Sequence, residues 1–94
     1  MTDLDTLRKI IDQCDVEIVK AIEKRFSTVK EVVQYKADNN LEIYQPNREK
    51  EVLEKVNSYL DSKEFSEELK SLYIHIMKIS KEIQNGKSSK IKEQ

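Results

Sequence analysis

Residues 5–37 read DTLRKIIDQCDVEIVKAIEKRFSTVKEVVQYKA, an unbroken run that contains neither Gly nor Pro. Apolar side chains recur along this run at steps of three and four, which keeps them on one face of a helix. They are Leu4, Leu7, Ile11, Cys14, Ile18, Ile22, Val29 and Val32. We therefore predict a single helix over residues 5–37, about 50 Å long at ~1.5 Å per residue.

A helix of this length does not fit inside the domain that the chain could form. The sequence has 94 residues, and a compact chain of that size has a radius of gyration near ~12 Å and a diameter of roughly 30 Å. The predicted helix would overhang such a domain and expose its apolar stripe. Because isologous pairing is the commonest way to cover such a stripe, we predict an entwined homodimer.

Two shorter helices are expected after the long one. Pro46 suits a first helical turn, and apolar residues at helical spacing follow it to near residues 61–62. Ser66 is the expected N-cap of the third helix, which should end before Gly86, the only glycine. The fold class is thus all-α with three helices per chain. Residues 1–86 form one domain, and residues 87–94 are a polar tail that we expect to be flexible.

The composition excludes several classes of function. Apolar and charged residues each make up 37% of the chain, and Gly and Pro occur once each, which favours exposed amphipathic helices over sheets. The 17 basic and 18 acidic residues are interspersed, so no cationic surface for nucleic acid is expected. No apolar run approaches the ~20 residues of a membrane span, so we expect a soluble, cytoplasmic protein. With one Cys and one His, neither a metal site nor a cofactor is expected.

Polar residues stand where each helix should be apolar. Arg25 and Lys36 interrupt the stripe of the first helix, and the other positions, on the second and third helices, are Arg48, Glu49, Ser80 and Gln84. Taken singly, each is commonly a solvated or snorkelling side chain. Together they would bury several cations with one carboxylate, which costs several kcal/mol unless an anion compensates. A ligand that carries carboxylates would supply that anion.

Arg8 lies too far from these residues to join them within one chain. It precedes Arg25 by seventeen residues, or roughly 25 Å along a helix axis. In an antiparallel dimer of the long helix, the start of one copy would lie near the middle of the other. Arg8 of a second copy could then reach the group.

Five segments in order resemble the all-helical class of chorismate mutases, over about residues 4–85. They are Leu7-Arg8 with Ile11 and Asp15, Lys24-Arg25, Lys36, Gln45-Pro-Asn-Arg48-Glu49 and Ser80-Lys-Glu-Ile-Gln84. Enzymes of this family are entwined dimers of three-helix chains. The resemblance implies conversion of chorismate to prephenate, an intramolecular [3,3] rearrangement on the route to phenylalanine and tyrosine. That reaction needs no nucleophile, metal or proton transfer, because the protein restrains the substrate and stabilises developing charge.

The resemblance also implies a role for each matching residue. Arg8 of the partner grips one substrate carboxylate, Arg25 grips the other, and Arg48 and Ser80 complete that wall. Lys36 and Gln84 donate to the ether oxygen, while Glu49 accepts from the ring hydroxyl. Gln45 stands where some members carry an aspartate, which should alter affinity near the hydroxyl.

Three further possibilities remain open from the sequence. An isochorismate pyruvate lyase has the same fold and grips a similar dianion, although the pair of Glu49 and Gln84 favours the mutase. A non-catalytic helical dimerisation module would have no use for the inward cations, and removing them would relieve desolvation. The chain could also dock on another enzyme of the same pathway.

Overall fold

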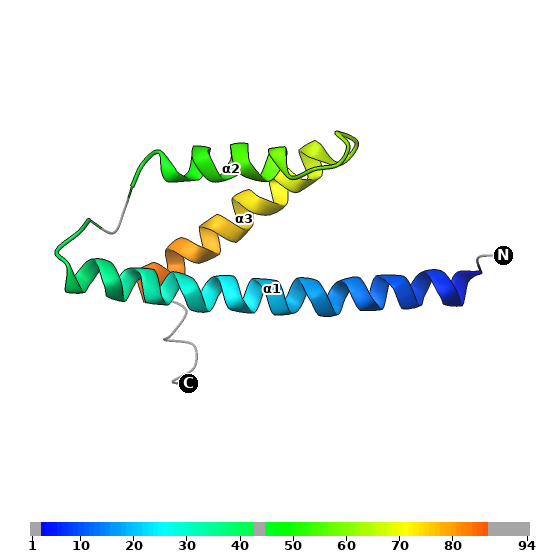
Figure 1. Cartoon of the computed structure of the whole chain (residues 1–94), viewed down its shortest axis with the longest axis horizontal. Helices are drawn as coiled ribbons and strands as arrows, with labels where there is room; N and C mark the ends of the chain where they lie inside the picture. The colour runs from blue at the N-terminus through cyan, green and yellow to red at the C-terminus, as the bar shows by residue number, and fades with distance from the viewer. Residues whose placement is uncertain (1–2, 43–44, 87–94) are drawn as a thin grey trace.

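The computed structural model describes residues 3–42 and 45–86, which form three helices. They are α1 (Leu4–Asp38), α2 (Arg48–Ser58) and α3 (Ser66–Gln84), with no strand among the described residues (Figure 1). The prediction of an all-α chain with one very long first helix is confirmed. The expected tail over residues 87–94 lies outside the described residues.

The two ends of α1 are set by local hydrogen bonds. At its start the Asp3 carboxylate accepts a hydrogen bond from the Thr6 backbone N–H at 2.8 Å, which caps the first turn. At its end Asn40 adopts a left-handed conformation with φ +57°, and the Leu41 N–H donates to the Lys36 carbonyl at 2.8 Å. This Schellman-type ending satisfies a carbonyl that the helix leaves open and turns the chain away from the α1 axis.

The second helix is shorter at both ends than the sequence predicted. Pro46 lies in a turn before α2, which the Arg48 N–H closes by donating to the Gln45 carbonyl at 3.0 Å. At the other end the Tyr59 N–H donates to the Val56 carbonyl at 3.1 Å, an i to i−3 bond that tightens the last turn. Pro46 therefore precedes the helix instead of starting it, and Leu60 continues the apolar spacing beyond the point where the helix ends.

Ser66 is the first residue of α3 and not its N-cap, which corrects the prediction. The N-cap is Phe65, and it makes no side-chain capping hydrogen bond. The Ser66 hydroxyl instead donates to Oδ1 of Asn57 at 2.8 Å, so it ties the start of α3 to α2. The end of α3 is as predicted, because Gly86 follows with φ +75°, a conformation in which side chains are strained.

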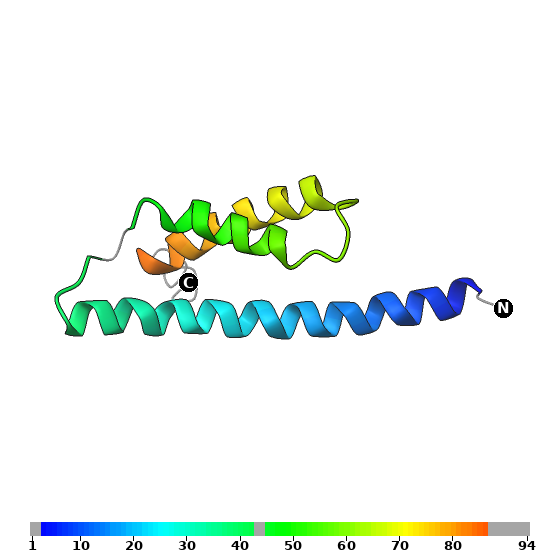
Figure 2. The same cartoon turned by 45° about the horizontal axis from the view of Figure 1, so that its top comes forward.

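The helix α3 packs against both of the others, and it runs diagonally from the end of α2 to α1 (Figure 1). Val52 and Val56 of α2 pack with Met77 of α3 as a small core, and Leu53 and Tyr73 close over it. The other face of α3 crosses the C-terminal half of α1 (Figures 1 and 2). This arrangement brings the end of α1, the start of α2 and the end of α3 together.

The N-terminal half of α1 has no other part of the described chain packed on it. It extends past α2 and α3 in both views (Figures 1 and 2), and α1 has no fully buried residue. Its apolar side chains are at least 45% exposed at Leu4, Leu7, Ile10, Ile11, Val16, Ile18 and Val19. The radius of gyration is 16.7 Å, well above the ~12 Å of a compact chain of this length. None of the described helices has both the length and the hydropathy to cross a membrane.

Candidate active site

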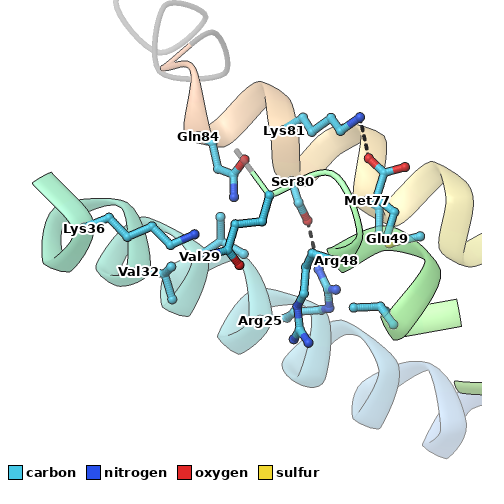
Figure 3. Close-up of a pocket in the computed structure, with 12 residues that line it drawn as sticks. Arg25, Val29, Val32, Lys36, Arg48, Glu49, Met77, Ser80, Lys81 and Gln84 are labelled. Carbon is cyan, nitrogen blue, oxygen red and sulfur yellow. Dashed lines mark hydrogen bonds and ion pairs between the residues drawn. The ribbon is translucent and has the colours of Figure 1, made fainter. Parts of the chain in front are cut away.

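A cavity of about 320 Å³ opens where the three helices meet (Figure 3). That volume is at the lower end of the range for small-molecule sites. Seven of the eight sequence-predicted site residues line it: Arg25, Lys36, Gln45, Arg48, Glu49, Ser80 and Gln84. The structure therefore gathers residues that are up to 59 positions apart onto one cavity.

Arg25 is held in place by two neighbours on α3. Its Nη1 donates to the Ser80 Oγ at 2.8 Å, and its guanidinium carbon lies 5.8 Å from the centre of the Tyr73 ring. The Ser80 hydroxyl has one proton, which it donates to the Ile76 carbonyl at 2.9 Å, so its oxygen is the acceptor for Arg25. Within residues 3–42 and 45–86, no carboxylate forms an ion pair with Arg25. This half-buried cation is therefore oriented by neutral groups and can bind an anion.

Two donors of different chemistry reach into the cavity from opposite walls. Lys36 is in the last turns of α1, three turns after Arg25, and its half-buried side chain runs toward the centre (Figure 3). Gln84 is the last residue of α3 and points its amide into the same space (Figure 3). A ligand atom between them could accept from an ammonium and from an amide.

Arg48 lines the cavity from the first turn of α2 and is exposed. Its guanidinium pairs with Glu51, which also lies 3.9 Å from the Lys55 ammonium, and all three side chains are more than half exposed. Exposed ion pairs of this kind contribute little to stability. Arg48 could therefore exchange Glu51 for a ligand carboxylate at small cost.

Glu49 shares its carboxylate with a lysine that the sequence reasoning did not single out. The Lys81 ammonium forms an ion pair with Oε2 of Glu49 across the gap between α3 and α2, and both residues line the cavity (Figure 3). Lys81 follows Ser80 directly and lies three residues before Gln84, so the helical spacing already put it next to two predicted site residues. Its pairing with Glu49 depends on how α2 and α3 pack, which a single sequence does not show.

The rest of the cavity wall is apolar, and the sequence offered no reason to place its residues in the site. It is formed by Val29, Val32, Val52 and Met77. Apolar walls around a few polar groups are typical of small-molecule sites, where they lower the local dielectric and strengthen each polar contact.

Arg8 is the predicted site residue that lies apart from this cavity. It is exposed, in the second turn of α1, and seventeen residues separate it from Arg25. At ~1.5 Å per residue that separation is roughly 25 Å, far beyond the reach of an arginine side chain. Within one chain Arg8 and the cavity do not meet.

Comparison with known proteins agrees with this geometry. A model of the chorismate mutase type II family matches residues 7–85, a span that includes all three helices almost completely. The chain is also 39% identical over 56 residues to a bifunctional chorismate mutase/prephenate dehydratase of Aquifex aeolicus (strain VF5). That match covers 60% of this chain and 16% of the longer relative. The chain belongs to the chorismate mutase type II family.

Proposed function

We propose that this chain is an isomerase that converts chorismate to prephenate in the biosynthesis of phenylalanine and tyrosine. The observation that carries the proposal is the cavity of a chain of this family. Arg25, Lys36 and Gln84 converge on it, and no carboxylate among the described residues pairs with Arg25. Chorismate carries two carboxylates, an ether oxygen and a ring hydroxyl. One carboxylate, the ether oxygen and the hydroxyl each have a matching group on the wall of this cavity.

The proposed chemistry needs restraint and electrostatics only. Arg25 and Arg48 would bind a carboxylate, which fixes the flexible dianion in its compact reactive shape. As the carbon–oxygen bond of the ether breaks and the new carbon–carbon bond forms, negative charge grows on the ether oxygen. Lys36 and Gln84 would donate to that oxygen, and electrostatic donors in a dry site are worth about 3 kcal/mol each. Glu49 would accept from the ring hydroxyl.

We propose further that the working site is shared by two chains in an entwined homodimer. The exposed apolar residues along the N-terminal half of α1 support this, because a second copy of α1 could cover them. An antiparallel partner would also bring its Arg8 to the middle of this α1, beside Arg25. The second carboxylate of the substrate would then have its own cation. Docking on another enzyme of the pathway stays a prediction.

The test is to add purified protein to chorismate and follow the loss of its ultraviolet absorbance, with products identified by chromatography. We expect prephenate from the wild type and a rate at least about 100-fold lower from Lys36→Ala, because that variant loses a donor to the ether oxygen. Lys30→Ala is the matched control, since Lys30 is exposed on the same helix and does not line the cavity. It should retain the wild-type rate.

Other outcomes would assign the chain differently. Pyruvate and a hydroxybenzoate from isochorismate, with chorismate inert, would make it a lyase on the same fold. Inertness toward both substrates, together with a Lys36→Ala variant that is as stable as the wild type or more so, would indicate a helical dimerisation module without catalysis.

A further inference from the structure

Lys81 and Glu49 form the one ion pair that joins two helices within the described residues. Glu49 is in the first turn of α2, and Lys81 is in the last turns of α3, one residue after Ser80. Both side chains line the cavity, and Oε2 of Glu49 has no contact with solvent (Figure 3). The pair therefore forms part of the cavity wall, which the core residues Val52 and Met77 also line.

We propose that Lys81 is a positioning residue, which fixes the orientation of the Glu49 carboxylate as the acceptor for the substrate hydroxyl. This inference rests on the proposed function. An ionised oxygen that has lost its water needs a cation or hydrogen-bond donors near it. Lys81 supplies that cation to Oε2, which leaves the second oxygen of Glu49 for the ligand. Without Lys81 the carboxylate would rotate toward water and away from the cavity.

The pairing also distinguishes Lys81 from Arg25. The charge of Lys81 is balanced by Glu49 within the protein, whereas Arg25 has no acidic partner among the described residues. Lys81 is therefore assigned to recognition of the hydroxyl through Glu49 and not to direct binding of a carboxylate. If so, its contribution should depend entirely on the charge of Glu49.

A double-mutant cycle tests this dependence. The rates of wild type, Lys81→Met, Glu49→Gln and the double variant are measured with chorismate, each as kcat and KM, with prephenate quantified by chromatography. We expect Lys81→Met to lower kcat/KM about tenfold in the wild type and by less than about twofold in Glu49→Gln, because coupled neighbours are non-additive. Lys81→Arg should restore most of the loss, since it preserves the cation. Lys78→Met, an exposed residue of α3 that does not line the cavity, is the matched control.

Each other result overturns the proposal. An equal loss in both backgrounds would show that Lys81 contacts the substrate itself. An unchanged or higher rate for Lys81→Met would show that the pair is not needed or that it obstructs Glu49. Thermal unfolding of every variant separates these cases from loss of fold. A wild type that does not convert chorismate would refute the proposed function, and this inference with it, before any variant is compared.

Discussion

The two halves of α1 have the same kind of apolar periodicity but meet different surroundings. Along residues 25–38, five side chains are half-buried at steps of one to four, because α3 crosses this half: Arg25, Phe26, Val29, Val33 and Lys36. Along residues 4–24, Ile22 is the one half-buried side chain, although the stripe there has more large apolar residues. One half of the helix is a wall of the cavity, and the other half is a bare apolar surface.

Apolar periodicity thus shows which face of a helix will be covered without showing what covers it. The C-terminal half is covered by the same chain, so its contacts can be read directly from the structure. The N-terminal half needs a surface that one chain does not supply. Variants that act on one half of α1 and leave the other intact test whether a second chain covers the N-terminal half.

The largest expected effect is on catalysis in mixed dimers. Arg8→Ala, in the uncovered half of α1, should lower activity about 100-fold if Arg8 serves the site of the other chain. Lys36→Ala, in the half that lines the cavity, should lower activity by a similar factor. Mixing the two inactive variants should restore about a quarter of the wild-type activity, because half of the dimers are mixed and each has one intact site. The measurement is chorismate turnover after exchange of differently tagged chains.

The controls for that experiment are the two variants refolded separately, which must remain inactive. If purified mixed dimers were also inactive, Arg8 would not contribute to a shared site. The two halves of α1 would then be independent of each other.

A smaller effect is expected on stability. Met77→Ala, in the core between α2 and α3, should lower the free energy of unfolding by about 2–3 kcal/mol, since Met77 is only 6% exposed. Ile11→Ala should cost about 1–2 kcal/mol although Ile11 is 57% exposed in the chain, because a second copy would cover it. Chemical unfolding at several protein concentrations separates the two, since a loss of dimer contacts depends on concentration.

If Ile11→Ala left the free energy of unfolding unchanged at all protein concentrations, no second chain would cover the N-terminal half of α1. An exposed apolar residue of a monomer changes stability by no more than about 0.5 kcal/mol when it is truncated. Such a result would mean that the N-terminal half of α1 stays bare in solution.

The smallest effect concerns the start of α1. The hydrogen bond from the Thr6 N–H lowers the pKa of the Asp3 carboxyl. The cap therefore stabilises the helix fully at pH values above the pKa that Asp3 has in the unfolded chain. This stabilisation should be lost as the pH falls through the folded-state pKa. The chemical shift of the Thr6 amide, followed by NMR between about pH 2 and 6, reports the loss. In Asp3→Asn the amide can still cap but does not titrate, so an identical acid transition there would refute the assignment.

The fold could be predicted in most of its detail because helical signals are local. The Asn39–Asn40 and Gly86 stops mark where α1 and α3 end, since both stops depend on left-handed backbone at a single residue. The limits of α2 were predicted too widely, because Pro46 lies in a turn before the helix and Leu60 continues the apolar spacing after it. Ser66 was misassigned because its hydroxyl pairs with Asn57, nine residues away, and not with its own helix.

From the residues alone, the site could be predicted only where a residue broke a pattern, and Gln45 came from the family resemblance. Arg25, Lys36, Ser80 and Gln84 stand at positions that should be apolar, and all four line the cavity, while their roles in catalysis stay predictions. Lys81 broke no pattern, because a lysine on an exposed edge of a helix is ordinary. Its partner Glu49 is 32 residues away, and only the packing of α2 on α3 brings the two together.

The contacts of Arg25 bear on the entropy of binding. An arginine side chain carries ~2 kcal/mol of rotamer entropy when it is free. Ser80 and the Tyr73 ring remove much of that freedom while the chain folds, before any ligand arrives. A carboxylate that binds Arg25 therefore meets a guanidinium that is already ordered, whereas one that binds the exposed Arg48 must order it first. Arg25 therefore loses most of its side-chain conformational entropy when the chain folds, whereas Arg48 loses it when the ligand binds.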